Sequence, residues 1–103
     1  MNNKILLRNA CAPHLSIELE AVKDPNEMHL CIPEAVRVRL GLEVTSQREV
    51  RGRDGSLKSV SYVGPIELRL TNHVCFIGAL VTGEEVLIGS IPMQGLITTL
   101  APN

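Results

Sequence analysis

A short polar segment interrupts an apolar stretch early in the chain, and its side chains are suited to chemistry. Asp24 begins the tetrapeptide Asp-Pro-Asn-Glu, which separates the alternating apolar and polar segment 15–22 from the apolar run 30–32. Carboxylates act as general acids and bases, and two that share one proton can activate a water molecule. The same tetrapeptide is typical of a β-turn, because Asp, Pro and Asn favour its first three positions. Both interpretations stay open on the local sequence.

Cysteine and histidine residues form a second set of candidate side chains. They stand in three close pairs: Cys11 and His14, His29 and Cys31, and His73 and Cys75. A His-x-Cys pair on a strand places both side chains on one face, where two such pairs could bind zinc. The spacing matches no usual zinc finger, so buried free cysteines are the favoured interpretation and no metal is expected.

Basic residues gather in a third place, a predicted hairpin. They are Arg48, Arg51, Arg53 and Lys58. A small barrel that binds RNA through this hairpin is one hypothesis. The chain has one Tyr, one Phe and no Trp, so it lacks a platform for stacking bases. A solvated hairpin whose charges discourage pairing with other chains is therefore favoured, and no nucleic-acid partner is expected.

Length and composition limit the remaining possibilities. The 103 residues predict a single domain, 1–103, and 45% apolar residues argue against disorder. A net charge of −1 gives no general attraction to nucleic acid or to anionic membranes. No apolar run is long enough to span a membrane, and three widely spaced cysteines favour a reducing compartment, so a cytoplasmic location is expected. No phosphate-binding loop or dinucleotide fingerprint is present, so no cofactor is expected.

The elements that must position these side chains are mostly strands. Alternating or continuous apolar segments predict strands at 4–8, 15–22, 48–53, 56–63, 66–70, 73–81 and 86–88, with a last apolar segment at 96–100. Asp54-Gly55 predicts a two-residue hairpin turn of type I′. Pro33 and Gly41 predict the beginning and end of one short helix. This pattern indicates an all-β barrel or sandwich with one helix.

The order of these motifs resembles the retropepsin-like aspartic proteases, most closely the small single-lobed prokaryotic type. In that family an apolar strand ends in Asp-Thr-Gly, and an Ile-Pro follows at a set distance; here Ile32 lies eight residues after Asp24. The segment 51–70 resembles the flap hairpin and the strand after it. The family's apolar-apolar-Gly signature corresponds to residues 87–89. The resemblance covers roughly residues 15–100.

This resemblance implies a small closed all-β barrel with one short helix near 33–41. It also implies a homodimer that acts on a peptide or protein, with Asp24 of each chain as a catalytic residue. The implied loop residues are Pro25 and Asn26. The implied flap and substrate-binding residues are Gly52, Arg53, Asp54, Gly55 and Ser56. The implied support of the loop is Leu87, Ile88 and Gly89, and the terminal segment 97–101 is expected to interleave between partners.

The chain departs from the family's Asp-Thr-Gly motif, which here reads Asp-Pro-Asn. Pro25 provides neither the hydroxyl nor the backbone N–H of the usual residue. Asn26 keeps an N–H and tolerates left-handed backbone better than most residues. Lys23 and Glu27 add charges on either side of the triplet. Two hypotheses follow: an aspartic endopeptidase that works as a homodimer, or an inactive relative that serves as a peptide-binding or dimerisation module.

Overall fold

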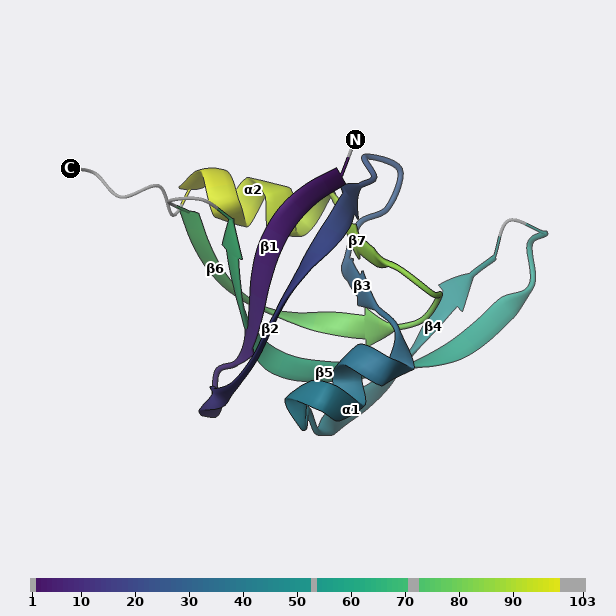
Figure 1. Ribbon diagram of the computed structural model, residues 1–103. Coiled ribbons are helices and arrows are strands. Elements are labelled where there is room, and N and C mark those ends of the chain that lie inside the picture. Colours follow the sequence, from purple (N-terminus) through teal and green to yellow (C-terminus); the bar gives the residue numbers. More distant parts are fainter. Residues whose placement is uncertain (1, 53, 71–72, 99–103) are drawn as a thin grey trace.

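The strands β1 (Asn2–Asn9) and β2 (Ala12–Lys23) form a long antiparallel hairpin at the beginning of the chain (Figure 1). The computed structural model describes residues 2–52, 54–70 and 73–98. The elements that follow are β3 (Leu30–Ile32), α1 (Glu34–Leu40), β4 (Val44–Arg51), β5 (Leu57–Leu70), β6 (His73–Val81), β7 (Val86–Ile88) and α2 (Ser90–Thr98).

Six strands close into a barrel, which confirms the predicted fold class. Neighbouring strands pair in the order β1, β2, β7, β3, β6 and β5, and a further pairing of β1 with β5 closes the ring. The pairs β2–β7 and β3–β6 are parallel, and the other pairs are antiparallel. β4 pairs only with β5, so the β4–β5 hairpin extends away from the barrel (Figure 1).

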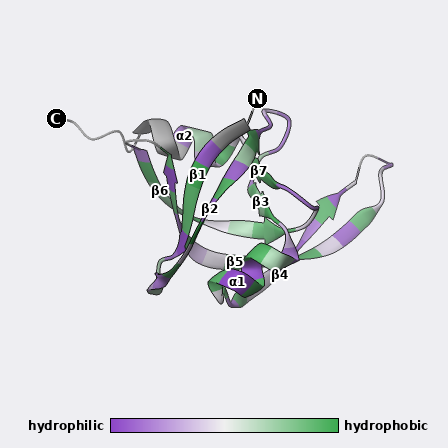
Figure 2. Ribbon diagram, viewed as in Figure 1, coloured by the Kyte–Doolittle hydropathy of each residue, from purple (hydrophilic) through white to green (hydrophobic). Residues whose placement is uncertain are grey.

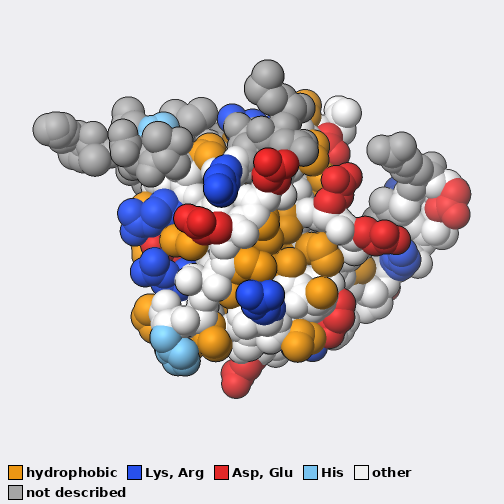
Figure 3. All heavy atoms as spheres, viewed as in Figure 1, with side chains coloured by type: hydrophobic (Ala, Val, Ile, Leu, Met, Phe, Trp, Pro, Cys, Tyr) orange, Lys and Arg blue, Asp and Glu red, His pale blue; other side chains and the backbone are white. Residues whose placement is uncertain are grey.

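The core is built from aliphatic side chains that alternate along the strands. In β2, apolar and polar residues alternate from 15 to 20 (Figure 2), and in β1 buried positions alternate with exposed or half-buried ones, as a strand with one face inward requires. The fully buried large side chains include Leu7, Leu30, Ile32, Leu68 and Ile88. Hydrophobic side chains also reach the surface in the middle of one face, bordered by charged groups (Figure 3). The barrel is therefore filled, although its wall is not covered on every side.

The short helix α1 confirms the prediction for residues 33–41. Pro33 is its N-cap, and the left-handed conformation of Gly41, with φ of 62°, ends it. The Gly41 N–H donates to the carbonyls of Arg37 and Val38, which the end of a helix otherwise leaves unpaired. Val36 and Leu40 face the barrel, so this helix of about two turns covers the end of the core.

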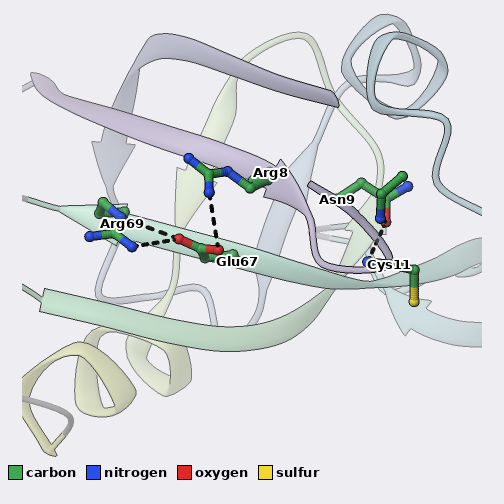
Figure 4. A network of polar contacts seen from close by, with 6 residues as sticks. Arg8, Asn9, Cys11, Glu67 and Arg69 are labelled. Carbon is green, nitrogen blue, oxygen red and sulfur yellow. Dashed lines mark hydrogen bonds and ion pairs between the residues drawn. The ribbon is translucent and has the colours of Figure 1, made fainter. Parts of the chain in front are cut away.

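Asn9 joins the end of α1 to the turn between β1 and β2 (Figure 4). Its side chain is buried, and its Nδ2 donates to the carbonyl of Leu40 at 2.9 Å and to that of Gly41 at 3.3 Å. Its Oδ1 accepts from the backbone N–H groups of Cys11 and Ala12. One buried amide therefore satisfies backbone groups that lie about thirty residues apart in sequence.

Replacing Asn9 by alanine should lower the free energy of unfolding by about 2 kcal/mol, because buried donors and acceptors lose their partner. Urea denaturation followed by circular dichroism measures the change. Asn9→Asp is the matched comparison: it keeps the acceptor for the turn but places a carboxylate oxygen against the Leu40 carbonyl. Asn9→Asp should also be destabilising, and wild-type stability in either variant would contradict this role for the amide.

Glu67 is the other buried polar side chain among the described residues, with 8% of its surface exposed. Its Oε2 accepts from Arg69 at 2.9 and 3.2 Å, and its Oε1 lies 3.9 Å from Arg8 on the neighbouring strand β1 (Figure 4). The carboxylate is thus compensated by two arginines at the β1–β5 pairing that closes the barrel.

The tip of the β4–β5 hairpin differs from the predicted two-residue turn. The backbone bond that closes it joins Gly52 to Ser56, whereas a two-residue Asp-Gly turn would pair Ser56 with residue 53, one position later in the chain. The Gly55 N–H donates to the Gly52 carbonyl, and Gly55 has φ of 86°. A longer loop with glycine in the left-handed position is the common alternative to type I′. The hairpin itself is confirmed, and Arg53 lies outside the described residues.

The end of the chain contains a second helix, α2, where the sequence predicted a terminal apolar strand. Pro92 is fully buried in the first turn of α2. Backbone N–H groups in a first turn have no partner within the helix, so proline, which lacks an N–H, costs no hydrogen bond there. The segment 97–101, expected to interleave as a strand, begins inside this helix, and residues 99–103 lie outside the described part. Neither helix, over the residues described, has the length and apolar character needed to cross a bilayer.

Candidate active site

Asp24 lies immediately after β2, at the start of the loop that leads to β3. Its backbone N–H donates to the Ile88 carbonyl at 3.0 Å, which continues the parallel pairing of β2 with β7. Its carbonyl accepts from the Glu27 N–H at 3.1 Å, and its Oδ1 accepts from the Asn26 N–H at 3.0 Å. The segment is therefore a β-turn, as its composition predicts, and the turn holds the Asp24 carboxylate against its own backbone.

The first residues of α2 hold the rest of this loop. The N–H groups of Gly89, Ser90 and Ile91 donate to the carbonyls of His29, Glu27 and Met28, at 3.1, 2.8 and 3.0 Å. The first N–H groups of a helix have no partner within it, so here the loop supplies their acceptors. This contact fixes the loop on the segment where the predicted support residues lie.

Gly89 is in contact with the loop backbone. A Cβ at this position would lie 2.6 Å from the carbonyl oxygens of Glu27 and His29 and from the carbonyl carbon of Met28. No other side chain fits there without moving the backbone. Leu87 and Ile88 precede it in β7, with Ile88 buried in the core. Of the three predicted support residues, Ile88 and Gly89 therefore contact the loop backbone, whereas Leu87 pairs with Val22 and Cys31 in the sheet.

The charges around Asp24 come from its neighbours in sequence. Lys23 and Pro25 are exposed, whereas Asp24 and Glu27 are half-buried. The Glu27 carboxylate accepts from the N–H groups of Met28 and His29, and it lies 3.8 Å from the His29 Nδ1. The Glu27 carboxylate is therefore held by the backbone of its own loop, three residues after Asp24.

Cys31 follows this loop in β3, where burial and the Glu27 and Asp24 carboxylates all affect the pKa of its thiol. Burial, together with these neighbouring carboxylates, raises the pKa of the thiol to about 12. Cys75 is also buried, and burial raises its pKa as well. Both side chains are therefore neutral thiols at physiological pH. Cys11 is exposed on the turn between β1 and β2.

Iodoacetamide should alkylate Cys11 in the folded protein at pH 8 and leave Cys31 and Cys75 unmodified. The thiolate is the reactive species, and burial disfavours it at the latter two positions. Mass spectrometry of the tryptic peptides gives the extent at each site, with urea-unfolded protein as the control in which all three react. Modification of Cys31 as fast as Cys11 would contradict its burial beneath the loop.

A second apolar cluster, separate from the barrel core, lies next to the loop. Its buried members are Cys31, Val60 and Leu80, and it is extended by Val50, Tyr62 and Leu87. These residues come from five strands, and Val50 and Val60 belong to the arms of the β4–β5 hairpin. The cluster therefore joins the hairpin to the wall of the barrel beside Asp24. The sequence pattern predicts this cluster only weakly, since its residues alternate with residues of the main core.

The predicted flap residues that the structure describes, which exclude Arg53, lie at the far end of the hairpin, away from the Asp24 loop (Figure 1). Asp54 accepts from the backbone N–H and the hydroxyl of Ser56, and these bonds lower the pKa of its carboxyl. Arg51 donates to the Gly55 carbonyl. The polar groups at the tip are thus used within the tip itself.

The structure does not bring the cysteine and histidine pairs together. Within residues 2–52, 54–70 and 73–98, no three acidic, cysteine or histidine side chains are placed to share a metal ion. The zinc alternative raised by the His-x-Cys spacing therefore finds no site among these residues.

Comparison with known proteins identifies no family for this chain. A scan against protein-family models gives no match, and a search of curated proteins finds none that is significantly similar.

Proposed function

We propose that this chain is a retropepsin-like aspartic endopeptidase that works as a homodimer and holds an extended peptide beneath the β4–β5 hairpin. The observation that carries the proposal is the way Asp24 is held. Its turn, its N–H bond to Ile88 and the contact of Gly89 with the loop fix one carboxylate at the end of a barrel strand. A fixed carboxylate beside an apolar surface is what a site of this chemistry needs.

The second apolar cluster provides a surface for the peptide. It reaches from Cys31, in the strand that follows the Asp24 loop, to Val60 of the hairpin arms, and its partly buried members Val50, Tyr62 and Leu87 offer the apolar surface. An extended peptide placed there would bury apolar side chains against this cluster and bring its backbone to Asp24. The hairpin would then close over it and exclude water.

The chemistry requires two carboxylates, and the two Asp24 side chains of a symmetric dimer would supply them. Two carboxylates in contact share one proton, because both cannot ionise at such a short distance. The ionised one removes a proton from water, whose oxygen attacks the peptide carbonyl carbon, and the protonated one donates to the carbonyl oxygen. When the C–N bond breaks, the amine nitrogen receives a proton and the carboxylates return to their initial state.

Exposed apolar side chains next to the loop favour a partner at this position. Met28 is 58% exposed and Ile91 is 42% exposed, and the Ile91 N–H donates to the Met28 carbonyl, so the two residues are adjacent. A second copy of the chain that covered this pair would bury apolar surface and bring its own loop to Asp24.

A second function, peptide binding without cleavage, is favoured by the residues around Asp24. Pro25 has no hydroxyl or N–H with which to link the two loops of a dimer, and the Glu27 carboxylate adds negative charge beside the dyad. Such a protein would keep the groove and the dimer and would lack the reaction. This module is the alternative to the endopeptidase.

One experiment separates the two functions. Concentrated protein is incubated with a diverse peptide mixture at acidic pH, the products are read by mass spectrometry, and sedimentation equilibrium is measured on the same sample. New termini produced by a dimeric protein support the endopeptidase. A dimer that retains peptides and produces no new termini supports the binding module. A monomer that neither retains nor cleaves peptides would overturn both.

A further inference from the structure

The two aromatic side chains of the protein line one hollow on the outside of the barrel. The chain contains one Tyr and one Phe, and both Tyr62 of β5 and Phe76 of β6 border this hollow of about 460 Å³. The other lining residues are Thr45, Gly64, Pro65, Ile77 and Gly78. Phe76 is 65% exposed, more than any other large apolar side chain that the structure describes. A large aromatic side chain left in water beside a hollow is typical of a surface that a partner covers.

Tyr62 links the hollow to the second apolar cluster, where we propose that the peptide binds. The ring of Tyr62 packs on the second apolar cluster and also lines the hollow. It lies against Gly78, where a Cβ would come within 2.4 Å of the ring. One side chain therefore forms the end of the apolar surface beside Asp24 and the beginning of the Phe76 hollow. An extended chain bound along that surface would reach both.

A positive charge stands at the junction of the two surfaces. The guanidinium carbon of Arg48 lies 4.2 Å from the centre of the Tyr62 ring. Its Nε donates to the Ser46 hydroxyl at 3.4 Å, and no ion pair between described residues includes Arg48. A guanidinium fixed on a ring keeps donors directed outward for a carboxylate.

We propose that the hollow between Tyr62 and Phe76 binds a large apolar side chain of the same extended peptide, and that Arg48 binds an acidic residue next to it. This inference rests on the proposed peptide groove and adds a preference within the peptide, at a distance from Asp24. The size of the hollow suits one or two side chains, and the adjacent cation suits a carboxylate, so a short apolar and acidic sequence fits the site.

The test uses a synthetic library of short, cysteine-free peptides captured by the dimeric wild-type protein. Captured peptides should be enriched in an aromatic or large aliphatic residue beside Asp or Glu. Because the chain has one Phe and one Tyr, the ring-proton signals of Phe76 and Tyr62 need no further assignment. Both signals should shift when a captured peptide is added.

Three variants then assign the contacts. Phe76→Ser should weaken binding of a captured peptide roughly tenfold. Arg48→Gln should weaken it several-fold for the acidic peptide and leave unchanged its matched version with Asn or Gln in place of the acid. Val38→Ser removes a side chain that is 60% exposed on α1, and it is the control that should bind as wild type does.

The outcomes are distinct. If peptides bind and Phe76→Ser binds them equally well, the hollow is not a subsite, and the proposed groove stands without it. If no peptide is captured, the chain does not bind peptides as proposed, and the inference that rests on this binding is also wrong. If Phe76→Ser turns a dimer into a monomer, the hollow is covered by a second copy of the chain, which also overturns the inference.

Discussion

Gly89→Ala is expected to lower the free energy of unfolding by about 2–3 kcal/mol, the cost of forcing extra volume into a tightly packed site. The added methyl group would lie 2.6 Å from backbone atoms of Glu27, Met28 and His29. Backbone cannot rotate away as a side chain can, so the loop has to move. The same movement would stretch the bonds from the beginning of α2 to the loop carbonyls and displace Asp24.

Urea denaturation measures the loss of stability, and Gly78→Ala is the matched comparison. A methyl group at Gly78 would also be too close to its neighbour, at 2.4 Å, but that neighbour is the end of the Tyr62 side chain. Tyr62 can turn toward solvent, so Gly78→Ala should cost less than Gly89→Ala. Equal stability of Gly89→Ala and wild type would show that the loop is not held as described.

Asp24→Asn is expected to reduce peptide cleavage at acidic pH by roughly 10²–10⁴-fold, the usual contribution of a general acid or base. An amide can neither take a proton from water nor share one with its partner. The Asn26 N–H can still donate to an amide oxygen at this position, so the loop should keep its conformation. The variant therefore removes the reaction and leaves the fold intact.

Rates of product formation measured by mass spectrometry give the size of this effect. Glu18→Gln, an exposed carboxyl on β2, is the control and should cleave as fast as wild type. Unfolding curves of both variants should overlay with that of the wild-type protein. Cleavage by Asp24→Asn at the wild-type rate would assign the activity to another group or to a contaminant.

Much of the fold follows from local patterns. The alternation in 15–22 and the pair Pro33 and Gly41 predict β2 and α1, because period and caps act within a few residues. The Asp-Gly pair predicts the hairpin, and the Asp-Pro-Asn triplet predicts the turn at Asp24. In each case the determining contacts are close in sequence.

The parts that escaped prediction depend on distant contacts. The α2 segment contains Gly95 and several β-branched residues, which disfavour a helix, yet the packing of α2 against β6 stabilises one. The closure of the barrel requires β1 to pair with β2 and β5 together. The cluster of Cys31, Val60 and Leu80 could not be distinguished from the core, because only the three-dimensional arrangement separates the two faces.

The proposed endopeptidase requires the Asp24 residues of two chains to meet at a two-fold axis. Carboxylates that share a proton bring their backbones near the distance that a disulfide spans, so cysteines at this position should cross-link. In a Cys11→Ser background, which removes the exposed thiol, Asp24→Cys should form a covalent dimer under mild oxidation, seen on a non-reducing gel and reversed by dithiothreitol. The control Glu18→Cys, in the same background, should form no covalent dimer on this gel. If Asp24→Cys forms no more dimer than Glu18→Cys, the paired active site is contradicted.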